Sequence, residues 1–216
     1  MTNISKNHCK LQAMCFFSQQ TKDATKVEKR FNAVVNDLLN FQTGAFNGFE
    51  HPRTPVITND SSDVVQHLQW GLIPHWAKDD SIKKYTLNAK IETLNEKPSF
   101  RNSINQRCLV IADGFFEWQW LDSKGRRKQK YLLTLPDEQL YAYAGIWSEW
   151  VSVLTGEIVK TYSIVTTEAT GIMREIHNTK KRMPVILTPE NEQLWLQNAP
   201  IAQFAKVHIE LCATKI

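Results

Sequence analysis

The stretch from residue 107 to residue 167 most constrains the fold, because strand-like segments follow one another there with only turn signals between them. The segments are residues 107–120, 130–135, 140–150 and 158–167. Turn signals stand at Asp113-Gly114, at residues 135–138 and at Thr155-Gly156. We expect residues 107–120 to form a strand pair or one bent strand, and the whole stretch to form a meander of hairpins.

Before this stretch, the sequence predicts one long helix and two strands. In residues 21–42 apolar side chains recur at three- and four-residue steps and charged ones fill the other face, which indicates an amphipathic helix capped by Thr21 or Asp23. Residues 45–63 hold Gly and Pro and predict an irregular loop with a short strand at 55–58. A second strand is expected at residues 64–73.

After it, Thr188-Pro189-Glu190 is a helix start signal, since Thr caps, Pro suits the first helical position and Glu favours the helix dipole. That helix should run to about Gln197 and bury Leu194 and Leu196, or Trp195. A short helix at 201–206 and a strand at 208–213 follow. We therefore predict one α+β domain with a β-rich, barrel-like core of meandering antiparallel sheet, flanked by a few helices.

Composition excludes two classes of protein. The chain of 216 residues holds 7 Trp, 5 Tyr and 10 Phe, enough apolar surface for a core, so disorder is not its dominant state. No apolar run approaches the roughly 18 residues of a membrane-spanning helix. The net charge of +4 permits an anionic partner without indicating one.

The cysteines and the N-terminus bear on the compartment and on metals. No two of the four cysteines, Cys9, Cys15, Cys108 and Cys212, have CxxC spacing, and the histidines show no ligand-like spacing, so we expect no metal and no cofactor. The first residues lack the apolar core of a signal peptide, which predicts a cytoplasmic protein with reduced thiols. Residues 1–13 are polar and predict a flexible leader before a domain at 14–216.

Cys15, in Met14-Cys15-Phe16-Phe17, has two interpretations. A lone Cys beside two Phe residues is usually a small buried hydrophobe. If translation starts at Met14, or if the leader is removed, Cys15 instead becomes the N-terminal residue. Its α-amine, with a pKa of about 7.7–8.0, is then partly neutral at pH 7 and can attack an aldehyde. The neighbouring thiol can close a five-membered thiazolidine ring.

Two further polar residues stand where a plain core would not place them. Asn88 is either a turn residue bonded to the backbone or an amide that holds a substrate oxygen or the Cys15 amine. Glu117, between Phe116 and Trp118, is either a surface carboxylate or a buried one. Burial would raise the pKa of the carboxyl and suit it to proton transfer near neutral pH.

After the segments around Cys15, Asn88 and Glu117, a fourth segment of interest contains His177 and the basic cluster that follows it. A loop histidine is more often structural than catalytic, but its ordinary pKa near 6.5 suits a general acid or base. Lys180, Lys181 and Arg182 form either a solvated turn or a phosphate clamp.

The order of these segments is more specific than any one of them, and it resembles the SOS-response-associated peptidase (SRAP) family, which crosslinks to abasic sites in single-stranded DNA. The resemblance spans about residues 14–187. It is carried by MC at 14–15, WGLIPHW at 70–76, LNAKIET at 87–93, ADGFFEW at 112–118 and His177 with RMPVIL at 182–187.

The resemblance implies a catalytic role for four residues. Cys15 corresponds to the N-terminal cysteine that forms a thiazolidine with the ring-opened sugar aldehyde, and Asn88 to the active-site asparagine. Glu117 corresponds to the glutamate that handles protons, both in crosslinking and in the peptide cleavage that exposes the cysteine. His177 corresponds to the histidine that assists opening of the deoxyribose ring and Schiff-base chemistry.

It also implies DNA contacts and a partner. Arg182 corresponds to a phosphate contact beside the site, and Trp76 to an aromatic side chain that stacks on or wedges against bases. Lys90, Lys180 and Lys181 are the other expected DNA contacts. The implied partner is single-stranded DNA with abasic sites, and we expect a monomer in the cytoplasm, associated with the nucleoid when bound to DNA.

The chain departs from the family pattern in places. Where CGRF is usual the chain has CFFS, so Phe17 replaces an arginine, and Lys90 replaces the arginine of NAR with a point charge. Residues 178–181 are additional in the histidine loop. Because residues 1–13 precede Cys15, its α-amine is free only if translation starts at Met14, which we favour, or if the protein cleaves itself before Cys15.

Two other functions remain open from the residues. Cys15 and His177 are also compatible with a Cys/His hydrolase that has a thiolate nucleophile. A non-catalytic module that binds single-stranded nucleic acid through Trp70, Trp76 and the basic loops is the third interpretation.

Overall fold

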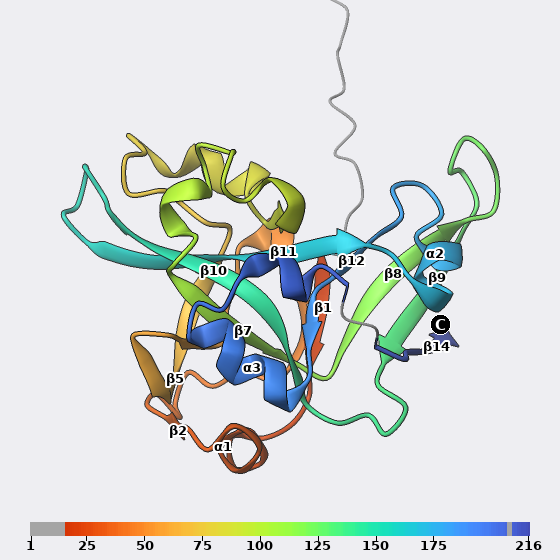
Figure 1. The fold of residues 1–216 in the computed structure, drawn as a ribbon, viewed down its shortest axis with the longest axis horizontal. Coiled ribbons are helices and arrows are strands. Elements are labelled where there is room, and N and C mark those ends of the chain that lie inside the picture. Colours follow the sequence, from red (N-terminus) through yellow and green to blue (C-terminus); the bar gives the residue numbers. More distant parts are fainter. Residues whose placement is uncertain (1–15, 207–208) are drawn as a thin grey trace, which may run out of the picture.

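The computed structural model describes residues 16–206 and 209–216, so the leader and Cys15 lie outside the described residues. Strands dominate it (Figure 1). They are β1 (Phe17–Gln20), β2 (Val34–Val35), β3 (Gly44–Asn47), β4 (Arg53–Thr58), β5 (Ser61–Trp70), β6 (Asn88–Lys90), β7 (Arg107–Ala112), β8 (Gly114–Trp120), β9 (Lys128–Thr134), β10 (Tyr141–Val151), β11 (Ile158–Glu168), β12 (Arg182–Pro184), β13 (Ile186–Leu187) and β14 (Cys212–Lys215).

The helices are short. The α-helices are α1 (Ala24–Phe31), α2 (Gly171–Ile176) and α3 (Pro189–Leu196). Short 3₁₀ helices occupy Gly48–Glu50, Asp80–Tyr85, Ile91–Thr93, Arg101–Ser103 and Ile201–Phe204. None of the described helices is both long and apolar enough to cross a membrane.

Five strands close into a barrel. The antiparallel neighbours β11, β10, β7, β4 and β5 follow one another, and β5 then returns to pair with β11. This closing pair is parallel and joins Thr161 to Gln69 and Tyr162 to Trp70. Because closure leaves these strands without free edges, the barrel is the rigid centre on which the other strands are mounted.

Large aromatic side chains fill the barrel. Trp70 and Tyr162 are almost fully buried, and their rings stack with centroids 6.1 Å apart. The Tyr162 hydroxyl shares a 2.7 Å hydrogen bond with the Thr54 hydroxyl, and burial raises the pKa of Tyr162. At Gly145 a Cβ atom would lie 2.6 Å from the Cys108 sulfur, so the interior at that level accepts only glycine.

Helices α1 and α3 cover the outer face of the barrel, where a second core contains Trp195 and Phe204 (Figure 1). The Trp195 indole donates to the carbonyls of Gly145 and Cys108 at 3.0 and 3.1 Å, which ties α3 to β10 and β7. Arg107 lies against this core, with its guanidinium 4.4 Å from the Trp195 ring.

A second sheet has the strand order β14-β9-β8-β1-β3, and its Phe115 and Leu133 pack into the same core as the barrel interior. The chain passes from the barrel strand β7 to the second-sheet strand β8 at Asp113, which is buried. Residues 107–120 are therefore a bent strand shared between two sheets. The strand-pair alternative is wrong, because β7 and β8 pair with other strands and not with each other.

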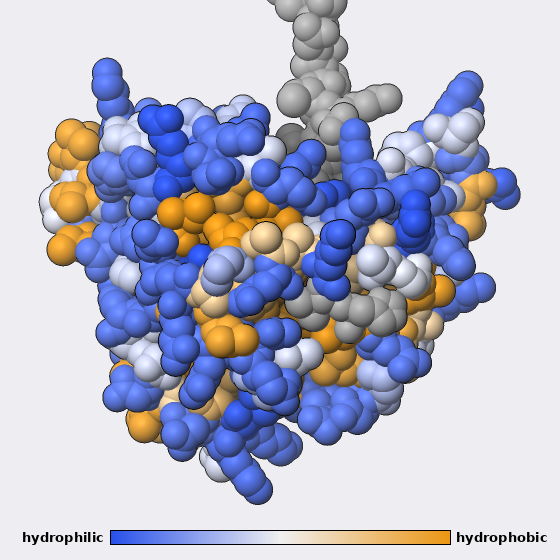
Figure 2. Space-filling view, viewed as in Figure 1, coloured by the Kyte–Doolittle hydropathy of each residue, from blue (hydrophilic) through white to orange (hydrophobic). Residues whose placement is uncertain are grey.

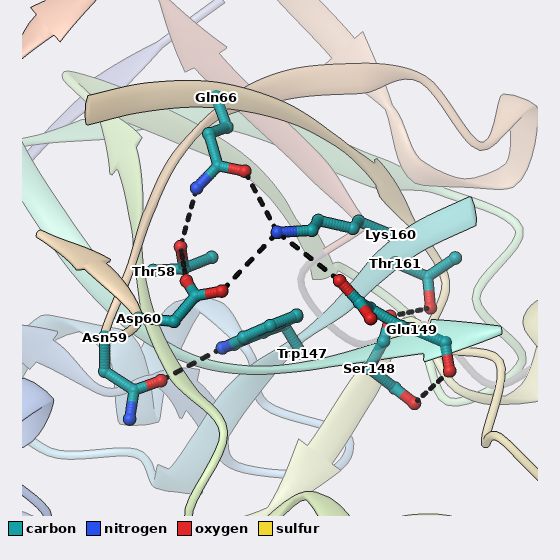
Figure 3. A network of polar contacts seen from close by, with 9 residues as sticks. All are labelled: Thr58, Asn59, Asp60, Gln66, Trp147, Ser148, Glu149, Lys160 and Thr161. Atoms are coloured by element: carbon teal, nitrogen blue, oxygen red, sulfur yellow. Dashed lines mark hydrogen bonds and ion pairs between the residues drawn. The ribbon is translucent and has the colours of Figure 1, made fainter. Parts of the chain in front are cut away.

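A network of polar contacts around Lys160 lies where β5, β10 and β11 come together (Figure 3). The Lys160 ammonium lies 3.5 Å from carboxylate oxygens of both Asp60 and Glu149, and donates to Gln66 at 3.4 Å. It also lies 4.9 Å from the centroid of the Trp147 ring. These side chains are partly exposed, so water screens the ion pairs.

Hydrophilic side chains cover most of the face shown in Figure 2. Apolar groups at its left edge lie over the turn between β10 and β11, where Leu154 is 96% exposed. The predicted fold class, an α+β domain with a β-rich and barrel-like core, is confirmed.

The predicted helix over residues 21–42 is mostly wrong. Helix α1 begins after Asp23, whose carboxylate accepts from the Lys26 amide at 2.9 Å, and ends at Asn32 in the left-handed conformation. Val34 and Val35 then pair with β5 as strand β2, because the sheet offers this β-branched pair backbone partners that a helix cannot. The helical pattern therefore continued into residues that a tertiary contact holds extended.

The elements predicted near the C-terminus are present, with shifted bounds. Helix α3 begins after Thr188 as predicted, and of its apolar side chains Trp195 is fully buried whereas Leu194 is 41% exposed. The short helix after it is a 3₁₀ turn, Ile201–Phe204. The last strand lies at Cys212–Lys215, later than the predicted 208–213, because residues 212–215 are those in register with β9.

Replacing Arg107 should destabilise the fold more than replacing Lys160, the partly exposed cation of Figure 3. Its side chain donates to the carbonyls of Ala199, Ile104 and Trp195 at 2.7, 3.2 and 3.3 Å, and desolvation lowers its pKa to about 10. Arg107→Met removes these three hydrogen bonds from the buried carbonyls, of which that of Trp195 keeps a bond from the Asn198 amide, and should lower the free energy of unfolding by about 2–4 kcal/mol. Lys160→Met should cost about 1 kcal/mol or less. Urea denaturation measures both, and equal losses would contradict the assignment.

Candidate functional site

Strand β8 and helix α2 bring Glu117 and His177 together. The carboxylate oxygen Oε2 of Glu117 lies 4.0 Å from Nδ1 of His177, and the two side chains are 2% and 1% exposed. Oε1 of Glu117 accepts a 3.0 Å hydrogen bond from the amide of Trp118, so the other oxygen is the one on the His177 side. Glu117 is therefore buried, and the surface-carboxylate interpretation is wrong.

A tight loop orients the imidazole of His177. The His177 carbonyl accepts from the Lys181 amide at 2.9 Å, and Lys181 adopts a left-handed backbone conformation. The chain thereby returns the Arg182 carbonyl to within 2.6 Å of His177 Nδ1. The Arg182 amide lies 3.2 Å from the same nitrogen, so the backbone of Arg182 fixes the orientation of the ring, and the tautomer decides which of the two groups Nδ1 bonds.

The additional residues of this loop attach it to β8. The Asn178 side chain accepts from the Trp120 amide at 3.1 Å and donates to the Trp120 carbonyl at 2.8 Å. The Gln119 amide donates to the Glu175 carbonyl at 3.2 Å. Asn178, which sequence analysis treated only as part of an insertion, thus fixes the histidine loop to the strand that carries Glu117.

Asn88 and the histidine loop reach the same barrel strand. Asn88 begins β6, which runs parallel to β11, and pairs with Ile164. Strand β12, directly after the histidine loop, runs antiparallel to β11 and pairs Met183 with Thr167. Asn88 is buried within a strand, so its interpretation as a turn residue is wrong.

The guanidinium of Arg182 is engaged within the protein. It donates to both carboxylate oxygens of Glu92 at 2.7 and 2.8 Å and to the Thr166 carbonyl at 2.7 Å. Partial burial acts to raise the pKa of Glu92, but the bonds from Arg182 outweigh it and the pKa lies below its usual value. Sequence analysis quoted Glu92 in LNAKIET and missed this pairing, which depends on two segments far apart in the chain.

The other residues expected to contact DNA are at the surface. Lys90, Lys180 and Lys181 are exposed, and Trp76 is 48% exposed. Trp70, which one interpretation used as a stacking surface, is instead fully buried and donates through its indole to the Leu87 carbonyl at 2.8 Å. It belongs to the barrel core and has no face to offer a base.

Asp113 anchors the strand next to β8. Its carboxylate accepts from the amide of Thr21 at 2.9 Å, from the Thr21 hydroxyl and from the Gln19 amide group at 3.3 Å, and it pairs with Lys22 at 3.8 Å. These contacts hold the end of β1, whose first residue, Phe17, stands opposite Phe116 of β8. Sequence analysis assigned Asp113 only to a turn.

Cys15 lies outside the described residues, and β1 begins two residues after it. The strand that follows Cys15 is therefore the direct neighbour of the strand that carries Glu117. Among the residues that the structure describes, no group of three or more His, Cys, Asp or Glu side chains is placed to hold a metal ion.

The amino-acid sequence is similar to a known family and to named proteins. The sequence model of the SOS response associated peptidase (SRAP) family matches residues 14–213. Abasic site processing protein YoqW from Bacillus subtilis (strain 168) is 42% identical over 142 residues, which cover 65% of this chain and 61% of that protein. Abasic site processing protein HMCES from Gallus gallus is 34% identical over 167 residues, covering 66% and 48%. The matched part thus spans less than two thirds of either relative.

The fold has a solved counterpart. A crystal structure of a protein from Bacteroides thetaiotaomicron superposes with a TM-score of 0.86 at 37% sequence identity, over 94% of this chain and 92% of that chain.

The anchoring role of Asp113 predicts a local effect. Asp113→Asn removes the negative charge, and hydrogen bonds to a charged group are worth about 1.5–3 kcal/mol each. Hydrogen exchange should therefore show faster exchange of the amides in residues 17–21, with strand β10 unchanged. Asp63→Asn, at an exposed carboxylate, is the control. Equal protection of β1 in the two variants would show that Asp113 does not hold the strand.

Proposed function

The chain belongs to the SRAP family, and from that membership we propose that it processes abasic sites in DNA. The observation that carries the proposal is the buried Glu117–His177 pair, in which Glu117 lies on β8, the neighbour of the strand β1 that Cys15 precedes. The curated relatives named above are abasic site processing proteins, which supports the same substrate for this chain.

The proposed chemistry is a covalent crosslink through Cys15 as the N-terminal residue. The α-amine of Cys15 adds to the aldehyde carbon of the ring-opened sugar and gives a carbinolamine. Loss of one water forms the imine, and the Cys15 thiol then adds across the C=N bond, its sulfur to carbon and its proton to nitrogen. The thiazolidine therefore forms with release of one water and without an oxidant or a cofactor.

Glu117 and His177 supply the proton transfers that these steps need. The amine must lose a proton as it attacks, and the carbinolamine hydroxyl must gain one to leave as water. Glu117 and His177 are both shielded from solvent, and we propose that each exchanges a proton with the reacting groups, because Oε2 and Nδ1 are 4.0 Å apart, beyond the roughly 2.6–3.2 Å over which a proton passes directly. Asn88 is proposed to orient the sugar oxygens or the amine by hydrogen bonds.

The proposed substrate is single-stranded DNA, bound by exposed side chains around the site. Trp76 offers a face for stacking on a base, and Lys90, Lys180 and Lys181 offer charge to phosphates. Arg182 already donates to both carboxylate oxygens of Glu92, so a phosphate that uses the same two nitrogens must compete with that carboxylate. Its gain in binding free energy is then reduced by the cost of weakening the Glu92 pair.

The leader decides whether the amine of Cys15 is free. We propose that translation starts at Met14 and that removal of this methionine exposes Cys15; cleavage by the protein itself, with Glu117 and His177 as proton carriers, is the alternative. Action as a monomer in a reducing cytoplasm is part of the same proposal. The described cysteines, Cys108 and Cys212, are both free thiols.

The position of Cys15 gives the first test. Proteins that start at Met1 and at Met14 are incubated with a single-stranded abasic oligonucleotide and separated on a denaturing gel. We expect a covalent band with the shorter protein, and with the longer one only after its leader is lost, as intact mass would show. Cys15→Ala should abolish the band and leave non-covalent binding intact, whereas Cys212→Ala should change neither.

Crosslinking by Cys15→Ala, or by a protein that still carries Met1, would overturn the proposed chemistry. Cleavage of unrelated peptides by the longer protein would favour a Cys/His hydrolase instead.

The proton-transfer pair gives the second test. Glu117→Gln keeps the shape of the side chain and removes its capacity to accept a proton, and should slow crosslinking by about 10²-fold or more. Glu175→Gln is the matched control, because Glu175 is exposed on α2 and contributes only its carbonyl to the site. Single-turnover rates across pH measure both. Wild-type rates in Glu117→Gln, with an unchanged pH profile, would remove Glu117 from the mechanism.

A further inference from the structure

The outer face of the β8–β9 hairpin carries aromatic rings and lysines in alternation. Phe116, Trp118 and Trp120 point to the side of β8 opposite Glu117, because side chains alternate along a strand. On β9, Lys130 stands opposite Trp118 and Lys128 opposite Trp120. We call these five side chains the lysine–aromatic face.

The lysines lie over the rings. The Lys130 ammonium is 4.2 Å from the centroid of the Phe116 ring and 5.5 Å from that of Trp118, and the Lys128 ammonium is 5.3 Å from that of Trp120. No ion pair within the described residues engages Lys128 or Lys130. Trp118 and Trp120 remain partly exposed. The proposed crosslinking chemistry uses none of these side chains.

The tip of the hairpin adds further positive charge. Residues 122–130 hold five cations, Lys124, Arg126, Arg127, Lys128 and Lys130, and one acid, Asp122. The Asp122 carboxylate accepts from the backbone amides of Lys124, Arg126 and Arg127 at 2.9, 3.2 and 2.7 Å, so it shapes the turn from which the cations project. Its distance of 3.9 Å from the exposed Arg127 guanidinium is a weak pairing.

The row of rings continues toward the candidate site. The ring of Phe17, the first residue of β1, lies 4.9 Å from Trp118, and that of Phe49 lies 6.5 Å from Phe17. Phe49 is 39% exposed. Aromatic side chains thus extend from the hairpin to the strand that begins two residues after Cys15.

We propose that the lysine–aromatic face binds single-stranded nucleic acid beyond the lesion, with bases against Trp118 and Trp120 and phosphates on Lys128, Lys130 and the tip. Stacking surfaces that alternate with cations bind single strands without reading sequence, because every base has a π face and every linkage a charge. Successive rings on one face of a strand are about 6.6–6.8 Å apart, room for one base each. The proposal rests on the proposed function and extends its DNA track.

The test compares oligothymidylates of about 5 and about 20 nucleotides, bound non-covalently and followed by fluorescence anisotropy. Lys128→Gln with Lys130→Gln should weaken binding of the longer strand only. The slope of log K against log salt for that strand should fall by about 1.4, which corresponds to two lost phosphate contacts. Trp120→Ala should weaken the same binding about 5- to 150-fold.

Two controls keep the result interpretable. Lys29→Gln with Lys97→Gln removes two exposed lysines elsewhere and should change neither binding nor slope. Lys128→Arg with Lys130→Arg keeps the charge and should retain the affinity, which separates lost contacts from lost folding. Crosslinking of a short abasic oligonucleotide should be the same in all these variants, so failure of the proposed function shows there and failure of this face shows in the longer strand.

Unchanged affinity and slope for the longer strand in the Lys128→Gln, Lys130→Gln variant would overturn the proposal. So would displacement of the longer strand by polyglutamate at the same charge concentration as by oligothymidylate, because that result assigns the face to an acidic protein partner.

Discussion

The parallel pairing of β5 with β11 is the contact on which the rest of the structure depends. It closes the barrel, and β11 then carries β6 and β12, the strands that deliver Asn88 and the histidine loop. A one-residue shift of either strand along β11 would turn its side chains to the opposite face. The position of β11 itself is fixed by the aromatic interior, since Trp70 of β5 and Tyr162 of β11 stack at the closing pair.

The sequence predicted those parts of the fold that local patterns determine. The strands between residues 107 and 167 and the start of α3 at Thr188 follow from alternation, turn residues and a cap, all within a few positions of one another. The closure of the barrel joins Gln69 to Thr161, a contact that no local pattern contains. Val34 and Val35 show the same limit, because a parallel contact with β5 overrode a helical pattern.

In the candidate site, too, the sequence predicted what local patterns determine and not what tertiary contacts determine. Glu117 and His177 were predicted from their order in the chain, and the structure adds that both are buried and 4.0 Å apart. That Trp70 lies in the core while Trp76 is exposed was not predictable, since both belong to WGLIPHW and differ only in tertiary surroundings. The pairing of Arg182 with Glu92 likewise needed two distant segments to meet across β11.

Strand β8 shows why the site and the lysine–aromatic face are linked. Alternation sends Glu117 inward to His177 and its neighbour Trp118 outward to Lys130, so one strand carries a buried carboxylate on one side and aromatic rings on the other. Asn178 holds the histidine loop through the backbone of Trp120, and Phe17 packs on Trp118. The strand that carries the outer rings therefore also holds the histidine loop and packs against β1, so the two faces of β8 share their supports.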